Sequence, residues 1–142
     1  MVLVLILFWN RNIFLLFFMR AVSTDKAPKA IGPYSQAVRS RGLLFCSGQL
    51  PMKLDGTMVE GTFEEKVVQI LENLKAVVEE AGSSFGNVLK VTVFMVDLNQ
   101  FAEFNEIYSR YFVEHKPARS TVQVVALPKG SPLEIECIAK VV

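Results

Sequence analysis

An arginine and two carboxylates near the C-terminus are the residues of this chain whose types and spacing could do chemistry. Arg119 stands at the start of a β-rich segment, and Glu134 and Glu136 alternate with the apolar Leu133 and Ile135 in the last such segment. Successive side chains of a strand point to opposite faces, so all three polar groups fall on faces that should be at least partly buried. Arginine and glutamate are seldom buried without a partner, so these side chains either pair or form a site.

The distance between Arg119 and Glu134 depends on how their two strands pair. If the strands form a hairpin through residues 127–132, the two side chains are about 20 Å apart at roughly 3.3 Å per residue. A shared site then has to lie between subunits, or the two strands have to be separated in the sheet. The residues by themselves favour a structural alternative, in which Arg119 forms a bridge to Glu136 or a neighbour.

Composition excludes several other kinds of chemistry. The chain has 142 residues, the length of one domain, with 15 basic and 14 acidic side chains and a net charge of +1. This balance argues against non-specific nucleic-acid binding, which needs a basic surface. The single histidine is His115, and the only cysteines are Cys46 and Cys137. We therefore expect no tetrahedral zinc or other metal site, no serine triad built on another histidine and no disulfide scaffold.

Residues 1–22 predict a hydrophobic leader or a wrongly assigned start, and residues 23–142 predict the domain. Asn10, Arg11 and Asn12 interrupt the apolar run where a membrane anchor would be most deeply buried. The run also lacks the basic beginning of a secretory signal and the polar face of a mitochondrial presequence. A removed leader, or translation that starts at Met19, remains open. We expect a cytoplasmic or mitochondrial protein, with membrane attachment only if the leader is retained.

Hydrophobic periodicity indicates which elements position the polar residues. Thr62 and Glu65 have the spacing of a capping box ahead of an amphipathic helix, and Gly82 follows that helix in the usual C-terminal role. A second apolar stripe at helical spacing follows Asp97 and stops before Pro117. The predicted order is strands at 36–40 and 43–47, a helix at 62–82, a strand at 88–96, a helix that Asp97 or Asn99 caps and that ends with His115 and Lys116, and strands at 120–126 and 133–141.

This β-β-α-β-α-β-β order predicts an α+β fold. Each predicted helix has a single apolar stripe, so both helices should cover one face of one sheet. The other face of the sheet would then be uncovered in a single chain. An apolar uncovered face implies self-association, most simply in a closed ring of identical chains.

Five sequence motifs, taken in this order, resemble the RidA (YjgF) family of reactive intermediate deaminases. The resemblance covers residues 24–142 and implies a chorismate-mutase-like, YjgF-type single mixed sheet with two helices on one face. It also implies a homotrimer with three sites at the subunit interfaces, which agrees with the uncovered face predicted above. The motifs are IGPYSQA (31–37), FCSGQLP (45–51), VFMVDLNQFAEFNEIY (93–108), PARSTVQVVALPKG (117–130) and LEIECIA (133–139).

The resemblance implies roles for residues in the last two motifs. Arg119 corresponds to the arginine that binds the substrate carboxylate, and a guanidinium can grip a carboxylate with two charge-assisted bonds. Glu134 corresponds to the carboxylate that holds the attacking water. Thr121 stands where some members carry a cysteine, so a role that needs a thiol is lost, although a hydroxyl can still form a hydrogen bond.

The earlier motifs imply the remaining contacts with substrate. Tyr34 resembles an aromatic wall with a hydroxyl, and Ser47 and Gly48 resemble hydroxyl and backbone contacts. Asn105 resembles an amide beside the site. Each also has a structural alternative: a half-buried tyrosine, a strand end that needs glycine's conformation, and a solvent-facing asparagine on the second helix.

The implied reaction is hydrolysis of 2-iminobutanoate or 2-iminopropanoate to the 2-oxo acid and ammonia. Such imines arise from pyridoxal-phosphate dehydratases, so the protein would limit metabolite damage. The resemblance implies no cofactor, since an imine needs only an oriented water and a path for protons. Two alternatives remain: an endoribonuclease that inhibits translation, and a non-catalytic trimer that binds carboxylates or acts like a chaperone. Charge balance and the lone His115 oppose the endoribonuclease, and we expect no nucleic-acid partner.

Overall fold

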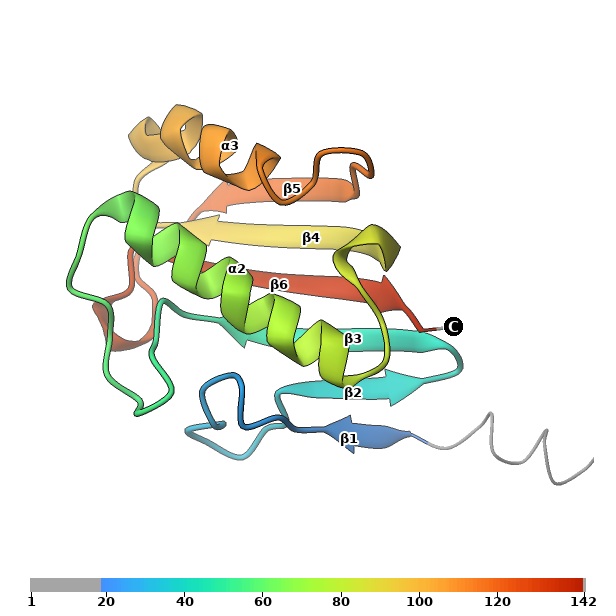
Figure 1. The fold of residues 1–142 in the computed structure, drawn as a ribbon. Helices are drawn as coiled ribbons and strands as arrows, with labels where there is room; N and C mark the ends of the chain where they lie inside the picture. Colours follow the sequence, from blue (N-terminus) through green and yellow to red (C-terminus); the bar gives the residue numbers. More distant parts are fainter. Residues whose placement is uncertain (1–18, 142) are drawn as a thin grey trace, which may run out of the picture.

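One mixed six-stranded sheet with two helices is the architecture of residues 19–141, which the computed structural model of the protein describes (Figure 1). The strands lie in the order β1-β2-β3-β6-β4-β5, and β4 and β5 run parallel while the other neighbours are antiparallel. The predicted single mixed sheet is confirmed. The elements are β1 (Arg20–Val22), β2 (Ala37–Ser40), β3 (Leu43–Gln49), α2 (Phe63–Glu80), β4 (Val88–Met95), α3 (Phe101–Ser109), β5 (Ala118–Gln123) and β6 (Leu133–Lys140).

Strand β1 extends the sheet into the segment expected to be a leader. It pairs with β2 and places Arg20 opposite Arg39. The described sheet therefore begins three residues before the expected domain start at residue 23. The rest of the expected leader, residues 1–18, lies outside the described residues. Within residues 19–141, neither helix combines the length and the apolar character needed to cross a bilayer.

The N-terminal hairpin and the first helix form as their local sequence predicts. β2 and β3 pair around a turn in which Arg41 and Gly42 both have positive φ. The Thr62 hydroxyl accepts a hydrogen bond from the backbone N–H of Glu65, whose carboxylate in turn accepts one from the backbone N–H of Thr62. This reciprocal cap satisfies two donors that the first turn of α2 would otherwise leave unpaired.

The second helix is shorter than its apolar stripe. Asp97 caps a 3₁₀ turn at Leu98–Gln100 by accepting from the N–H of Asn99, and α3 starts directly after that turn. α3 ends at Ser109, although Phe112 beyond it is still buried. The stripe therefore continues through a turn as well as a helix, and periodicity alone does not distinguish the two.

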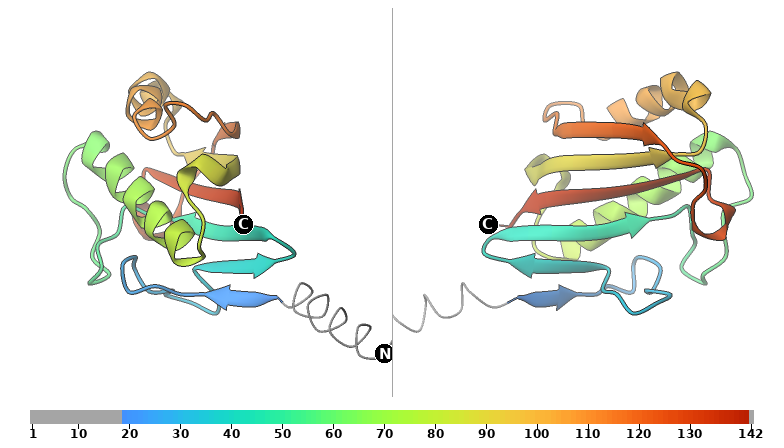
Figure 2. Two further views of the ribbon diagram at one scale, coloured as in Figure 1. Left: turned by 45° about the vertical axis from the view of Figure 1, so that its right-hand side comes forward. Right: turned by 180° about the vertical axis from the view of Figure 1, so that it is seen from behind.

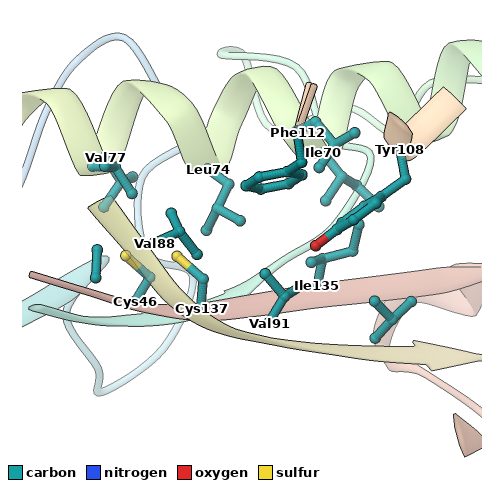
Figure 3. Packing of buried hydrophobic residues seen from close by; sticks show 14 of the residues in the cluster. Cys46, Ile70, Leu74, Val77, Val88, Val91, Tyr108, Phe112, Ile135 and Cys137 are labelled. Atoms are coloured by element: carbon teal, nitrogen blue, oxygen red, sulfur yellow. The ribbon is translucent and has the colours of Figure 1, made fainter. Parts of the chain in front are cut away.

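Both helices cover the same face of the sheet, as predicted (Figure 2). The core between them and the sheet is built from α2 residues such as Leu74 and Val77, which lie over Val91 and Ile135 of the central strands, with Tyr108 at its α3 end (Figure 3). The opposite face has no helix against it in the described chain (Figure 2). We call that surface the open face.

The two cysteines meet within this core. Cys46 of β3 and Cys137 of β6 are directly opposite each other, and both thiols are free (Figure 3). A hydrogen bond with Cys46, together with burial, raises the pKa of the Cys137 thiol. The Cys137 thiol is therefore an uncharged core group with Cys46 buried beside it, and the sheet does not depend on a disulfide.

The last two strands do not form a hairpin with each other. β4 lies between them, parallel to β5 and antiparallel to β6. β5 also begins at Ala118 and ends at Gln123, earlier than the predicted strand at 120–126. Of the arrangements considered above, separation of the two strands within the sheet is the one observed, and it decides where Arg119 and Glu134 lie.

A candidate active site in two halves

The Arg119 guanidinium lies between β5 and α3, at the edge of the sheet. Its Nη2 donates to the Oδ1 of Asn105 over 2.7 Å. Its Cζ lies 4.6 Å from the ring centroid of Tyr108, 5.5 Å from that of Phe104 and 5.6 Å from that of Phe101. Aromatic faces attract a cation without neutralising it. Asn105 and the three rings therefore fix the guanidinium and leave its full charge in place.

Tyr108 supports Arg119 as a neutral ring. Burial raises the pKa of Tyr108 to about 12, although the neighbouring Arg119 acts in the opposite direction. The phenol therefore stays protonated at physiological pH and presents its π face to the cation. Beside these two residues lies a cavity of about 370 Å³, which Asn105, Lys116 and Arg119 help to line.

No acid within residues 19–141 forms an ion pair with Arg119. The structural alternative of a bridge to Glu136 is therefore wrong, because Glu136 points to the open face while Arg119 points toward α3. Thr121 shares the α3 side with Arg119, and its hydroxyl is enclosed without a hydrogen-bond partner in the described chain. Its contact with substrate stays a prediction.

Glu134 lies in a second pocket, on the open face. This pocket has a volume of about 410 Å³, and Tyr34, Ser47, Gly48 and Glu136 line it together with Glu134. Glu134 is half-buried, and burial first and the charge of Glu136 second raise the pKa of its carboxyl above the usual value. Such a carboxyl holds a proton more strongly than an exposed one, which suits a group that takes protons from water.

Gly48 is needed for the contact it allows rather than for its own conformation. A Cβ added at this position would lie 1.8 Å from the Oε1 of Glu134 and 2.6 Å from its carboxyl carbon. Gly48 is also absent from the glycines with positive φ, so the interpretation as a strand end that needs glycine's conformation is wrong. The missing side chain lets the Glu134 carboxyl lie directly against the β3 backbone.

Hydrogen bonds between β3 and the segment before β2 hold the other side of this pocket. The Ser47 hydroxyl donates to the carbonyl of Ser35 over 2.6 Å, so its donor is used internally while its oxygen can still accept. The Tyr34 hydroxyl accepts from the N–H of Ile31 over 3.2 Å, and its side chain is 47% exposed. Ser47 therefore anchors the segment that carries Tyr34.

Gln36 is a positioning residue that the sequence did not reveal. It is 3% exposed, its Oε1 accepts from the N–H of Thr24 over 2.6 Å, and its Nε2 donates to the carbonyl of Pro28 over 2.7 Å. One buried amide thus satisfies the backbone of the turn before Tyr34. A glutamine before a short strand has no distinctive pattern in sequence, so only the structure identifies this role.

The two halves face opposite sides of the sheet within one chain. Arg119 is in register with Val91 and Cys137, whose side chains lie in the core under the helices. Glu134 is in register with Phe94 on the open face. Arg119 and Asn105 therefore come together on one side, with Thr121 beside them. Tyr34, Ser47, Gly48 and Glu134 come together on the other side.

Comparison with known proteins identifies the family. The model of the family described as Endoribonuclease L-PSP, which comprises the RidA (YjgF) proteins, matches residues 24–141. The chain belongs to the RidA family. The expectation drawn from the five motifs is thus confirmed.

Relatives of this RidA-family chain carry several descriptions. A RutC family protein of Pyrococcus abyssi is 50% identical over 119 residues, which cover 83% of this chain and 94% of the relative. The human 2-iminobutanoate/2-iminopropanoate deaminase is 48% identical over 121 residues, covering 84% of this chain and 88% of the human protein. The family role of deaminating reactive intermediates is thus supported, while the names of other relatives differ.

A solved structure supports the fold of this RidA-family chain. The crystal structure of Escherichia coli TdcF with bound serine matches with a TM-score of 0.81 and 45% identity, over 85% of this chain and 98% of that chain.

No group of three or more histidine, cysteine, aspartate or glutamate side chains in residues 19–141 is arranged to hold a metal ion. The chemistry that the two halves of the candidate site can offer is capture of an anion by Arg119 and proton transfer by Glu134.

Proposed function

We propose that this protein hydrolyses small 2-imino acids, such as 2-iminobutanoate and 2-iminopropanoate, to 2-oxo acids and ammonia. The observation that carries the proposal is the guanidinium of Arg119, held by a neutral amide and three aromatic rings without an acidic partner in residues 19–141. A cation kept in this state is ready for a carboxylate from outside the chain. Every 2-imino acid carries one.

Glu134 provides the proton transfers that the reaction needs. A water held by its carboxylate adds its oxygen to the imine carbon and passes one proton to Glu134, which passes it to the imine nitrogen, so that a carbinolamine forms. The Glu134 carboxylate then takes the proton of the carbinolamine hydroxyl and passes it to the amine nitrogen. The carbon–nitrogen bond breaks as the carbonyl forms, and the 2-oxo acid and ammonia leave. The raised pKa of the Glu134 carboxyl favours it as the base in the first step. Tyr34 and Gly48 form the walls around it.

Because the two halves face opposite sides of one sheet, we propose that each site forms between neighbouring chains of a homotrimer. Glu134 and Tyr34 of one chain would then face Arg119 of the partner subunit. Exposed apolar side chains on and beside the open face, Phe45 at 45% and Val122 at 44% exposure, favour its burial against another copy. The three sites of the trimer would thus each use two chains.

The comparisons support this proposal from two directions. The human relative is named for the same two imino acids, and it shares about half of its aligned residues with this chain. The TdcF structure holds serine, a small molecule with a carboxylate next to a nitrogen-bearing carbon, which is the pattern of a 2-imino acid. Both agree with a small anionic substrate.

Replacement of Arg119 by alanine tests the proposal. The imine is generated in situ by a dehydratase acting on serine or threonine, and release of the 2-oxo acid is followed above the spontaneous rate. We expect Arg119→Ala to lower kcat/KM by roughly 100-fold, since two charge-assisted bonds to the carboxylate are lost. Arg39→Ala, which removes an arginine near the opposite sheet edge, is the control and should keep wild-type activity. Equal activity of the two variants would refute the proposal.

An endoribonuclease is the second candidate, because the matching family carries that description. The single histidine, His115, makes a contact of 2.5 Å with the carbonyl of Val88 and lines neither pocket. Cleavage by a pair of histidines is therefore not possible within one chain. RNA degradation that Arg119→Ala abolishes, without any imine hydrolysis by the wild-type protein, would favour this alternative.

A further inference from the structure

Glu136 shares the pocket of Glu134 but has no assigned role. The two carboxylates occupy alternate positions of β6, so both point to the open face, and both line the same pocket of about 410 Å³. At about 3.3 Å per strand residue, their backbone positions are roughly 6.6 Å apart. Two like charges on adjacent side chains of one strand face, partly shielded from water, repel each other.

Other charged and titratable groups of the same chain that lie around the pocket do not offset this repulsion. Lys29 lines the pocket but forms an ion pair with the exposed Asp25 at 3.8 Å. Lys90, on the same face of β4, donates to the Ser120 hydroxyl over 2.6 Å. Tyr34 is the only other titratable residue that lines the pocket in the described chain, and its hydroxyl accepts from the N–H of Ile31. Within one chain, Glu134 therefore has Glu136 as its close charged neighbour. In the proposed homotrimer, Arg119 of the partner subunit would face the same pocket and would act in the opposite direction, in the wild-type protein and in Glu136 variants alike.

The contact with Gly48 limits how far the Glu134 carboxyl can move away from Glu136. Its carboxyl lies against the β3 backbone, so it cannot turn away from Glu136 toward that strand. Burial and the charge of Glu136 act on it in the same direction, and both raise its pKa. The carboxylate that holds the attacking water thus has its proton affinity raised by its neighbour on the same strand.

We propose that Glu136 is a positioning residue whose negative charge makes Glu134 a stronger base toward the attacking water. This inference rests on the proposed function, since it gives Glu136 a role in that reaction. Glu136 does not touch the reacting atoms. It acts through the charge that it places two residues along β6 from the carboxyl that does.

The pH dependence of Glu136→Gln tests this inference. Loss of the neighbouring charge lets Glu134 give up its proton at lower pH, so the acid limb of kcat/KM should move to lower pH. A weaker base also abstracts the water proton more slowly, so the plateau rate should fall by about two- to fivefold. A merely structural role would lower the rate at all pH values and leave the position of the acid limb unchanged.

Two further variants separate charge from shape. Glu136→Asp keeps the negative charge and should keep the acid limb near its wild-type position. Glu79→Gln is the control, since it removes a carboxylate from the exposed side of α2, and Glu79 does not line the pocket. It should change neither the position of the acid limb nor the plateau value of kcat/KM. If Glu136→Asp moves the limb as far as Glu136→Gln does, the inference is wrong.

A titration that needs no substrate distinguishes failure of the inference from failure of the proposed function. The carboxyl signal of Glu134 is followed by carbon-13 NMR in the assembled protein, and it is assigned by its absence in Glu134→Gln. Its midpoint should fall in Glu136→Gln. An unchanged midpoint in an enzyme that hydrolyses imines overturns the inference alone. Absence of imine hydrolysis by the wild-type protein overturns the proposed function, and with it the catalytic role of Glu136.

Discussion

The surroundings of the Arg119 guanidinium and of the Glu134 carboxyl affect the two groups in different ways. Aromatic rings and one amide surround Arg119, so its charge is fixed in place but not neutralised. Glu134 is half-buried against the β3 backbone at Gly48, so burial first and the charge of Glu136 second raise the pKa of its carboxyl. Neither group has an ionic partner of opposite sign in residues 19–141, so each would be able to interact with the proposed substrate.

Substitution of Gly48 tests the placement of the Glu134 carboxyl. A methyl group in Gly48→Ala would overlap the carboxyl, so Glu134 must move. We expect imine hydrolysis to fall by about 10-fold or more, because displacement of a catalytic group by about 1 Å has that scale of effect. The control is Gly86→Ala, where the added carbon would meet only the Ser84 hydroxyl at 3.6 Å. Equal activity of both variants, measured in the coupled assay, would contradict this placement.

The types of the site residues can be predicted from sequence, but the causes of their placement cannot. Alternation along the last strand puts Glu134 and Glu136 on one face, and the structure has them there. The alternation pattern does not predict that Gly48 makes room for the Glu134 carboxyl, because that contact joins residues 86 positions apart in the sequence. For the same reason the internal hydrogen bond of Ser47 to Ser35 was not predicted.

At the scale of elements, local signals were reliable and strand partners were not. The capping box at Thr62 acts within a few residues and forms as predicted, and a turn at Gly42 joins the two strands predicted at 36–40 and 43–47. β5 and β6 are close in sequence, but β4 lies between them in the sheet. A hydrophobic pattern indicates that a segment is a strand without indicating its neighbour. The helix predicted between β4 and β5 is the kind of crossover that a parallel pair requires, but nothing in the pattern indicates that β6 pairs with the other side of β4.

The segment before β2 depends on Gln36 for its conformation. Gln36→Ala would leave the backbone N–H of Thr24 and the carbonyl of Pro28 without their buried partner. We expect local loosening of residues 23–35 at a cost of about 1–3 kcal/mol, with a raised KM because Tyr34 is no longer held. Amide hydrogen exchange of that segment checks the loosening. Gln100→Ala, at the start of α3, is the control and should leave both exchange and KM unchanged.

At the scale of the whole molecule, the two halves of the site point away from each other. Arg119 lies at the β5 edge on the helix side, and Glu134 lies on the open face. A closed ring is the arrangement that brings one half of each chain against the other half of the next chain. The proposed trimer would therefore complete the proposed sites as well as bury apolar surface.

Mixing two inactive variants tests whether each site is shared. Arg119→Ala and Glu134→Gln chains should each be inactive as homotrimers. If they are unfolded together and refolded at equal amounts, about a quarter of the interfaces will pair an intact arginine with an intact glutamate, as follows for random cyclic assembly. The imine hydrolysis of the mixture should then recover to about a quarter of the wild-type value. Mixtures that stay inactive, although mass spectrometry detects mixed trimers, would place both residues in a single-chain site.

The opposed halves have a consequence for the life of the protein in a cell. A chain that has just left the ribosome holds every residue of the proposed centre and yet no complete centre, because its own arginine and glutamate lie on different sides of the sheet. Catalytic output would then rise more steeply than chain abundance wherever the copies are dilute. Quaternary association would act as the final maturation step of this enzyme.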